Sequence, residues 1–257
     1  MKLAFSTLAC PRWSIEEVVA AAKQYGYEGV EIRLVDGRVV DPSLPEGDRM
    51  RVRKAFKDAG LPIVALDTSV KVAADPSMTE LVSMLELVSM LELAGELGAP
   101  IVRVFGGGQS KGPARKFLGE AAAKAHELGV TIALETHDEF SSAEVVAEVL
   151  HDTPASIGAL WDVAHTYRSG EDAATVLRLL EDRIAHVHIK DARRDGVLTL
   201  LGEGDVPVRE SLGALASAGY GGWISVEWEK HWHPELAEPE VALPQFAAVL
   251  RSWRKDE

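Results

Sequence analysis

Acidic and histidine side chains stand near the ends of four consecutive apolar segments in the second half of the chain. The residues are Glu135, Asp162, His188 and Glu227. Each segment is short and rich in Val, Ile, Leu and Ala, which is typical of a parallel strand buried on both faces. Because side chains alternate along a strand and parallel strands end at the same edge, we expect these four side chains to converge on one point.

This donor set predicts a divalent cation. With the imidazole neutral, the three carboxylates give the group a formal charge of −3. Without a counter-charge, they would repel one another and shift toward protonation. Hard oxygen donors favour Mn²⁺ first, with Mg²⁺ and Co²⁺ close behind and Zn²⁺ also accommodated, over a structural zinc site built from thiolates. For any one of these acids, helix capping or ion pairing is as good an explanation as metal binding. Such roles explain poorly why four polar residues stand at the ends of four consecutive segments.

Other polar side chains of the same predicted edge are candidates for contact with a substrate. His137 has the inward parity, although capping a loop explains it equally well. Lys190 ends the seventh apolar segment and suits a carboxylate, a phosphate or another substrate oxygen. His186, one layer deeper, fits a core or supporting position better. Three earlier segments close with residues for which ion pairing between strands is as reasonable as substrate binding: Arg33, Asp67 and Arg103.

Eight apolar segments alternate with stretches of helical periodicity along the chain. They cover residues 3–8, 29–33, 62–67, 100–105, 130–135, 157–162, 184–190 and 223–228. Eight βα units in about 250 residues are typical of a (β/α)8 barrel. A doubly wound sheet needs a Gly-rich phosphate turn after its first strand, and residues 6–9 (STLA) do not form one. The pattern predicts an α/β fold with one TIM-barrel domain over residues 1–257.

Two segments depart from a minimal barrel. Residues 228–257 are long enough for an extended loop and helix, which either folds over the site or contacts a neighbouring subunit. The sequence ELVSML at 80–85 is repeated at 86–91, which either lengthens an outer helix or exposes a Leu/Met stripe to a partner helix. Six residues do not match a turn of about 3.6, so the two copies cannot present the same helix face.

Composition narrows the function classes. With 27 Lys and Arg against 40 Asp and Glu, the net charge is −13, which argues against a nucleic-acid partner. The single Cys10 cannot form an internal disulfide and fits a reducing cytoplasm. No stretch approaches the ~18–20 apolar residues of a membrane span. We therefore expect a cytoplasmic protein without a membrane partner.

The chain resembles, over essentially its whole length, the sugar phosphate isomerase/epimerase family with a xylose-isomerase-like TIM barrel, within the apurinic-endonuclease-like superfamily. The most specific motifs are LETH at 134–137, WDVAH at 161–165, HVHIKD at 186–191 and ISVE at 224–227. The resemblance implies that one divalent metal is held by Glu135, Asp162, His188 and Glu227. It also implies that His165 and Arg194 contact substrate hydroxyls, and that Glu135 and Glu227 act as base and acid.

The implied reaction is isomerisation or epimerisation of a sugar or sugar phosphate through removal of a proton next to a carbonyl. A divalent ion would stabilise the resulting enediolate. Loss of a β-hydroxyl instead would make the protein a dehydratase or other lyase acting on a keto-sugar or inosose. A non-catalytic sugar-binding or partner subunit is a third alternative, although a binder needs no acid–base pair. We expect a homo-oligomer, dimer or tetramer.

The superfamily also contains DNA-repair endonucleases, and the sequence disfavours that function. Those enzymes carry additional histidines at the ends of the second and third strands, where this chain has Arg33 and Asp67. A net charge of −13 also opposes binding to a phosphate backbone.

Overall fold

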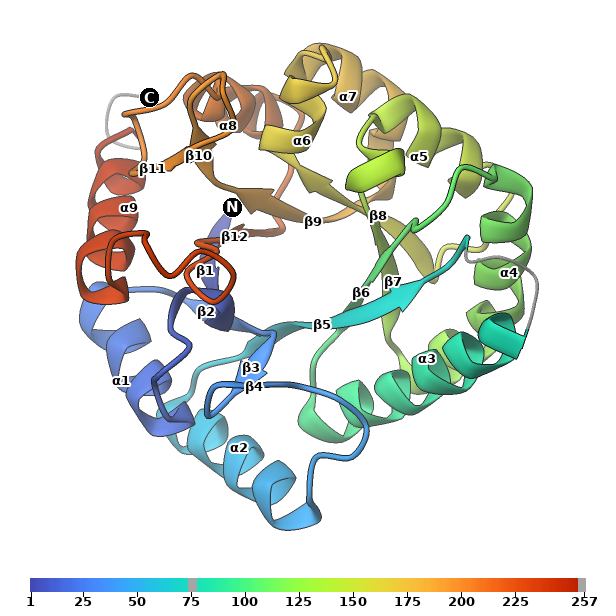
Figure 1. Ribbon diagram of the computed structural model, residues 1–257, viewed down its shortest axis with the longest axis horizontal. Helices are drawn as coiled ribbons and strands as arrows, with labels where there is room; N and C mark the ends of the chain where they lie inside the picture. Colours follow the sequence, from blue (N-terminus) through green and yellow to red (C-terminus); the bar gives the residue numbers. More distant parts are fainter. Residues whose placement is uncertain (74–77, 254–257) are drawn as a thin grey trace.

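Eight parallel strands close into a barrel in the computed structural model, which describes residues 1–73 and 78–253. Around the barrel the strands follow the order β1, β12, β9, β8, β7, β6, β5 and β2 (Figure 1). They span Lys2–Ser6 (β1), Gly29–Ile32 (β2), Ile63–Lys71 (β5), Ile101–Phe105 (β6), Thr131–Glu135 (β7), Ile157–Asp162 (β8), Ile184–Ile189 (β9) and Trp223–Val226 (β12). Each strand overlaps one predicted segment, so the predicted single TIM barrel is confirmed.

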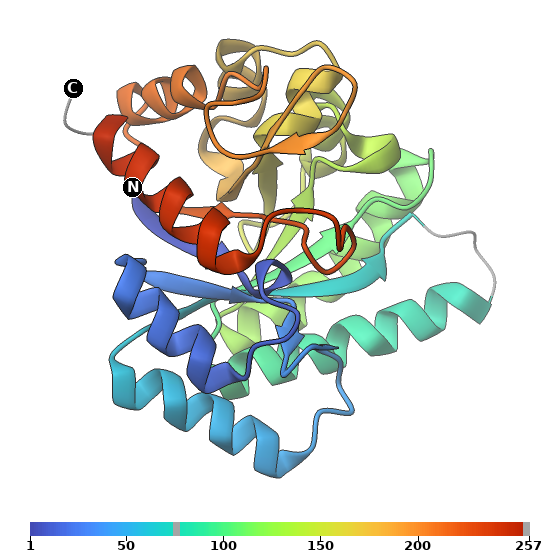
Figure 2. The ribbon, with the colours of Figure 1, turned by 60° about the vertical axis from the view of Figure 1, so that its left-hand side comes forward.

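Helices surround the strands (Figures 1 and 2). Those that follow successive strands are α1 (Ile15–Tyr25), α2 (Glu46–Ala59), α3 (Met78–Leu97), α4 (Lys111–Leu128), α5 (Ala143–Leu150), α7 (Ala173–Leu180), α8 (Val208–Ser217) and α9 (Pro239–Trp253). A further short helix, α6 (Val163–Arg168), begins directly after β8. Among the described residues, no helix is both long and apolar enough to cross a membrane.

Local sequence signals explain where the helices begin and end. In α1 the Ser14 hydroxyl accepts the Glu17 N–H, and the Glu17 carboxylate accepts the Ser14 N–H at 2.7 Å. This reciprocal pair satisfies two backbone donors that the helix leaves free. The helix ends at Gly26, whose φ of 75° lies in the left-handed region that glycine adopts without strain.

Side chains fill the barrel interior in layers. A small apolar cluster consists of Ala65, Ile101, Ala133 and Leu160. Each of these residues stands two positions before a polar residue of its own strand, so the polar side chain faces inward one layer nearer the carboxyl end. The polar layer contains Asp67, Arg103, Glu135 and Asp162, all at most 1% exposed. The apolar layer therefore forms the floor on which the polar groups are held.

Two short antiparallel hairpins lie in the connections between strands and helices. β3 (Leu34–Val35) pairs with β4 (Arg38–Val39), and β10 (Asp191–Ala192) pairs with β11 (Leu198–Thr199). Sequence periodicity did not predict them, because two-residue strands carry no periodic signal. The predicted third strand was also too short, since β5 continues to Lys71 across an irregularity in its pairing with β6.

The ELVSML repeat lies in α3, and its two copies have different surroundings. Leu81 and Leu85 of the first copy are 64% and 60% exposed, whereas the equivalent Leu87 and Leu91 of the second copy are buried. The prediction that the copies present different faces is confirmed. The side chain of Glu80, the first residue of the repeat, lies outside the described part of the structure.

The chain between β12 and α9 lies beside the carboxyl end of β1 (Figure 2). The His231 N–H donates to the carbonyl of Leu8 at 3.1 Å, and the Trp228 indole donates to the carbonyl of Ala237 at 2.9 Å. This segment therefore lies against its own barrel, and the expected contact of residues 228–257 with a neighbouring subunit stays a prediction. Residues 254–257 lie outside the described part.

Candidate metal centre

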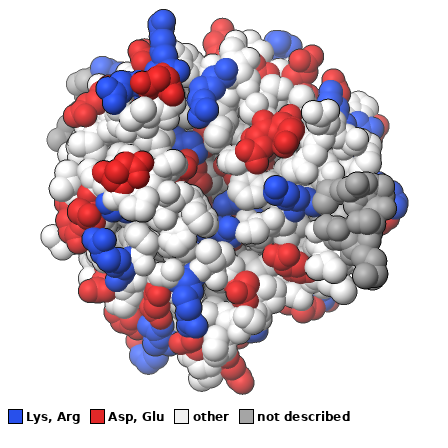
Figure 3. All heavy atoms as spheres, viewed as in Figure 1, with Lys and Arg blue, Asp and Glu red and all other residues white. Residues whose placement is uncertain are grey.

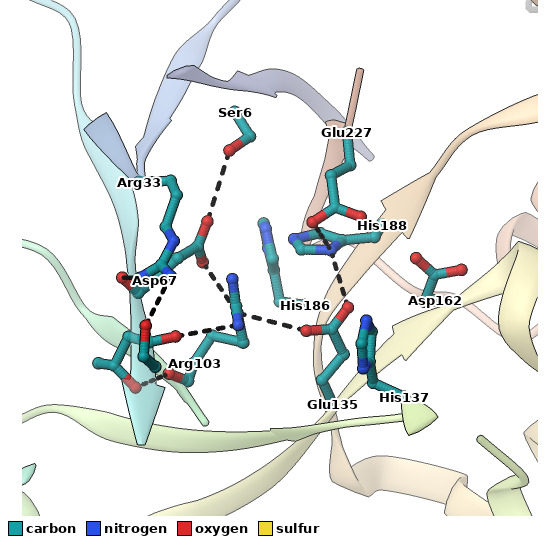
Figure 4. A network of polar contacts seen from close by, with 12 residues as sticks. Ser6, Arg33, Asp67, Arg103, Glu135, His137, Asp162, His186, His188 and Glu227 are labelled. Atoms are coloured by element: carbon teal, nitrogen blue, oxygen red, sulfur yellow. Dashed lines mark hydrogen bonds and ion pairs between the residues drawn. The ribbon is translucent and has the colours of Figure 1, made fainter. Parts of the chain in front are cut away.

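The structure brings Glu135, Asp162, His188 and Glu227 together at the carboxyl end of the barrel (Figure 4). One donor atom from each lies within 4.8 Å of the others. His188 Nδ1 is 3.4 Å from Glu135 Oε1 and also 3.4 Å from Glu227 Oε1. All four side chains are buried. Strands β7, β8 and β9 carry the first three, and Glu227 follows β12, where its N–H extends the ladder to the carbonyl of Ile189.

These donor atoms fit a divalent cation. Both carboxylate oxygens of Glu135 and Nδ1 of His188 are buried without a hydrogen-bond partner among the described residues. Orphaned buried polar atoms cost free energy, so several at one point indicate donors arranged for a ligand. Donors held by one metal at about 2.1 Å lie roughly 3 to 3.5 Å apart, which is the separation around His188. The set suits one divalent metal but does not select Mn²⁺ among the candidates.

Lys190 lies against two carboxylates of this centre and against that of Glu229. Its ammonium is 2.5 Å from Glu227 Oε2, 2.9 Å from Asp162 Oδ2 and 2.7 Å from Glu229 Oε1. Burial alone would lower the pKa of Lys190, but these carboxylates hold it well above its usual value. Burial would likewise raise the pKa of Glu227, but Lys190 and His188 outweigh it and hold that pKa well below its usual range. Lys190 therefore stabilises the carboxylate form of Glu227.

Arg103 approaches Glu135 from β6, the strand that pairs with β7. Its Nε is 3.3 Å from Glu135 Oε2 and 3.5 Å from Asp67 Oδ1, and its Nη1 donates to the Thr68 carbonyl at 3.0 Å. The Ser6 hydroxyl donates to the other oxygen of Asp67 at 3.4 Å. Sequence analysis left ion pairing and substrate binding open for Asp67 and Arg103, and the structure shows the ion pair between neighbouring strands β5 and β6.

Glu31 is a buried carboxylate that sequence analysis missed. It extends from β2 to two imidazoles, with Oε2 2.5 Å from His186 Nε2 and 3.0 Å from His188 Nε2. A carboxylate accepts hydrogen bonds, so each Nε2 carries the proton. Burial lowers the pKa of His188, but Glu31 and Glu227 hold it well above its usual value, and the ring would present a lone pair at Nδ1 once a metal displaces the second proton. The signal available in the sequence was parity, because Glu31 shares an inward face with Arg33, two residues later.

The three remaining predicted substrate residues have different positions. His165 follows Asp162 in α6, and its N–H donates to Asp162 Oδ1 at 2.9 Å. The rings of His165 and His137 lie edge to face, with centroids 4.6 Å apart. One donor atom from each lies within 4.8 Å of a donor atom of Glu135, so both histidines border the centre. The structure does not bring Arg194 there: its side chain is 85% exposed and lies 3.9 Å from Asp205.

A cavity of about 260 Å³ opens beside the candidate centre. Its lining residues are Leu8, Arg33, Arg103, Phe105, His137, Glu227, Glu229 and Trp232. Figure 3 shows a hollow in the middle of this face, with both basic and acidic side chains at its walls. The cavity therefore presents charged, aromatic and imidazole groups to a small polar molecule.

Asp191, directly after Lys190, has a structural position. Its carboxylate accepts backbone N–H bonds from Ala192, Gly202, Gly204 and Val206, at 2.8, 2.8, 3.1 and 3.3 Å. These bonds hold residues 192–206, the segment with the β10–β11 hairpin, against the barrel. The acid of the HVHIKD motif thus anchors this segment, while Lys190 belongs to the centre.

Replacing Asp191 by alanine is expected to lower the free energy of unfolding by about 2–4 kcal/mol, because several N–H groups lose a charged acceptor together. Urea denaturation measures the loss, and hydrogen exchange should rise within residues 192–206. Asp195→Ala is the matched control, since Asp195 accepts one backbone bond, from Val197 at 3.1 Å. Equal stability of the two variants would contradict the anchoring role.

Comparisons with known proteins agree with the fold. A family model described as xylose isomerase-like TIM barrel matches residues 19–253. An inosose dehydratase of Lacticaseibacillus casei is 30% identical over 142 residues, which are 47% of this chain and 47% of that protein. The match thus spans about half the length of that curated relative.

Solved structures share the fold over the whole chain. A structure titled IolI protein with a binding zinc atom has a TM-score of 0.83 at 20% identity, covering 100% of this chain and 99% of that one. A D-tagatose 3-epimerase-like protein has a TM-score of 0.82 at 18% identity, covering 100% and 98%. At these identities the likeness shows the fold alone.

Proposed function

Because the chain belongs to the xylose isomerase-like TIM-barrel family, we propose that it is a divalent-metal-dependent dehydratase acting on a keto-polyol of the inosose type. The observation that carries this proposal is the convergence of Glu135, Asp162, His188 and Glu227, with orphaned donor atoms, beside a cavity of about 260 Å³. Sequence analysis placed isomerisation or epimerisation first and dehydration second. The inosose dehydratase relative favours the second reading.

The proposed site would hold the metal on Glu135, Asp162, His188 and Glu227. When bound, the metal supplies Lewis-acid polarisation of a substrate carbonyl and makes the neighbouring C–H more acidic. Asp162 and His188 serve as ligands. Glu135 and Glu227 each have a carboxylate oxygen 3.4 Å from His188 Nδ1, so both carboxylates would lie beside a substrate bound at the metal.

The chain's own groups then account for elimination of water. One carboxylate of the Glu135–Glu227 pair takes the proton from the carbon next to the carbonyl. The C–H electron pair forms a C=C bond as the C–O bond to the β-hydroxyl breaks, and that hydroxyl leaves as water with the proton that the carboxylate took. Lys190, held among Glu227, Asp162 and Glu229, keeps Glu227 in the basic form that such a transfer needs.

Epimerisation or isomerisation is the second candidate. The presence of two carboxylates, Glu135 and Glu227, at the same centre favours it. If Glu135 removes a proton on one side and Glu227 returns one on the other, the same carbon is inverted. Return of the proton to the neighbouring carbon instead exchanges an aldose and a ketose. Both outcomes share the first step with dehydration, so the products separate them.

The proposed function is tested first by metal content. We expect about one divalent ion per chain by elemental mass spectrometry after dialysis against Mn²⁺, Co²⁺ or Zn²⁺, and we expect Asp162→Ala to lose it because one carboxylate ligand is removed. The loaded protein, incubated with inososes and cyclic keto-acids in D₂O, is expected to exchange the hydrogen next to the carbonyl and release water.

Each outcome separates the candidates. Exchange with water loss supports the dehydratase, and exchange with recovery of an isomeric ketone supports the epimerase or isomerase. A protein that binds no metal after reconstitution contradicts the four-ligand centre.

A further inference from the structure

Arg33 is a buried cation beside the candidate metal centre that the proposed function leaves without a role. It directly follows β2, is 6% exposed, and lines the same cavity as His137 and Trp232. Figure 4 shows it on the opposite side of the network from Glu227 and His188. The residue therefore lines the cavity beside the proposed metal, while the end of its guanidinium extends toward β5.

The guanidinium of Arg33 has neutral hydrogen-bond partners. Nη1 donates to the backbone carbonyl of Asp67 at 3.0 Å, and Nη2 donates to the hydroxyl of Ser69 at 2.7 Å. A guanidinium has five N–H donors, so these two bonds leave others to use. None of its nitrogens is among the buried atoms that lack a partner, and the residue lines the cavity, so its remaining donors are accessible there.

The carboxylates nearest to this cavity are committed to other cations. Asp67 is paired with Arg103 at 3.5 Å. Glu227 and Glu229 are paired with Lys190 at 2.5 and 2.7 Å. Within residues 1–73 and 78–253, no ion pair joins Arg33 to an acid. Burial and the neighbouring Arg103 oppose the charge of Arg33 and lower its pKa, and the more distant carboxylates of Asp67, Glu227 and Glu135 offset this only in part. An anion bound in the cavity would offset the remaining cost.

We propose that Arg33 binds a carboxylate of the substrate, which makes the substrate a cyclic polyhydroxy keto-acid rather than an uncharged keto-polyol. The inference that the substrate is a keto-polyol rests on the proposed function, whereas the inference that it carries a carboxylate rests on the surroundings of Arg33. The planar edge of a guanidinium matches the two oxygens of a carboxylate. A phosphate dianion is disfavoured, because Glu227 and Glu229 line the same cavity and Arg103 is committed to Glu135 and Asp67.

The inference is tested by binding, without turnover. The probes are quinate, a cyclic polyhydroxy carboxylate, and its uncharged methyl ester, titrated calorimetrically into the Mn²⁺-loaded protein. We expect quinate to bind about ten- to a hundredfold more tightly than the ester, because a hydrogen bond to a charged group is lost in the ester. In Arg33→Gln this preference should disappear while affinity for the ester stays unchanged. Arg115→Gln, which removes an exposed charge on α4, is the matched control and should keep the preference.

Each other result overturns the inference. Equal affinity of the wild-type protein for acid and ester, including no binding of either at millimolar concentration, leaves no carboxylate subsite. A preference that survives in Arg33→Gln assigns the acid to the metal or to another residue. Tighter, Arg33-dependent binding of myo-inositol 1-phosphate points to a phosphate instead. The binding test requires no reaction, so the two proposals can fail separately. A preference for the carboxylate without hydrogen exchange or water loss would contradict only the proposed function. Dehydration of an uncharged inosose without that preference would contradict only this inference.

Discussion

Replacing Glu227 by glutamine is expected to lower kcat/KM by about a hundred- to ten-thousandfold, the range for loss of a general acid–base group. Glutamine keeps the size of the side chain and one oxygen donor, but it cannot take a proton at neutral pH. Lys190, 2.5 Å away, would also lose a charged partner, although Asp162 and Glu229 still hold it at 2.9 and 2.7 Å. The barrel should therefore remain folded while proton transfer is lost.

The measurement is solvent-deuterium exchange at the carbon next to the carbonyl, together with kcat/KM for water loss. Glu135→Gln should show a comparable loss, and Glu120→Gln, an exposed isosteric change on α4, should show none. Circular dichroism and metal content establish that each variant is folded and loaded. A Glu227→Gln variant that is folded and loaded, yet exchanges hydrogen at the wild-type rate, removes Glu227 from the acid–base role.

The barrel was predictable because its signal repeats. Eight apolar segments mark the strands. Because side chains alternate between the two faces of a strand, the position of a polar residue along its strand predicts whether it points into the barrel. The structure shows this alternation directly: Ala133 and Leu160 point into the barrel, and Glu135 and Asp162, two residues later on the same strands, point inward one layer above them. The candidate donor set followed from the same rule, since consecutive parallel strands lie side by side and end at one edge.

Pairings between distant segments were not predictable in the same way. Glu31 reaches His186 across 155 positions of the chain, and Arg33 has partners that only the closed barrel places beside it. Periodicity assigns a face to each residue, but it does not say which inward groups pair with one another. Arg194 illustrates the converse: the family resemblance implied a place for it at the site, but the β10–β11 hairpin carries it to the surface.

Replacing Glu31 by alanine is expected to weaken metal binding by about ten- to a hundredfold, the usual effect of losing a carboxylate behind a histidine ligand. Glu31 accepts the Nε2–H of His188 at 3.0 Å, so the metal would take the place of a proton at Nδ1, which lies 3.4 Å from both Glu135 and Glu227. Without that acceptor the ring is free to change tautomer and orientation. The metal dissociation constant measures the loss, and the visible absorption of bound Co²⁺ reports the altered ligand field.

Glu31→Gln separates positioning from a purely structural role. The amide oxygen of glutamine can still accept one N–H, from His188 or from His186, so partial recovery of metal affinity is expected with this variant. Urea unfolding of the metal-free proteins gives the structural cost independently, because both histidines are buried with Glu31 whether or not metal is present. If both variants lose stability while metal affinity and the Co²⁺ spectrum stay at wild-type values, Glu31 supports the core and does not orient His188. If affinity falls in alanine and partly returns in glutamine, the carboxylate acts on the metal through the His188 ring.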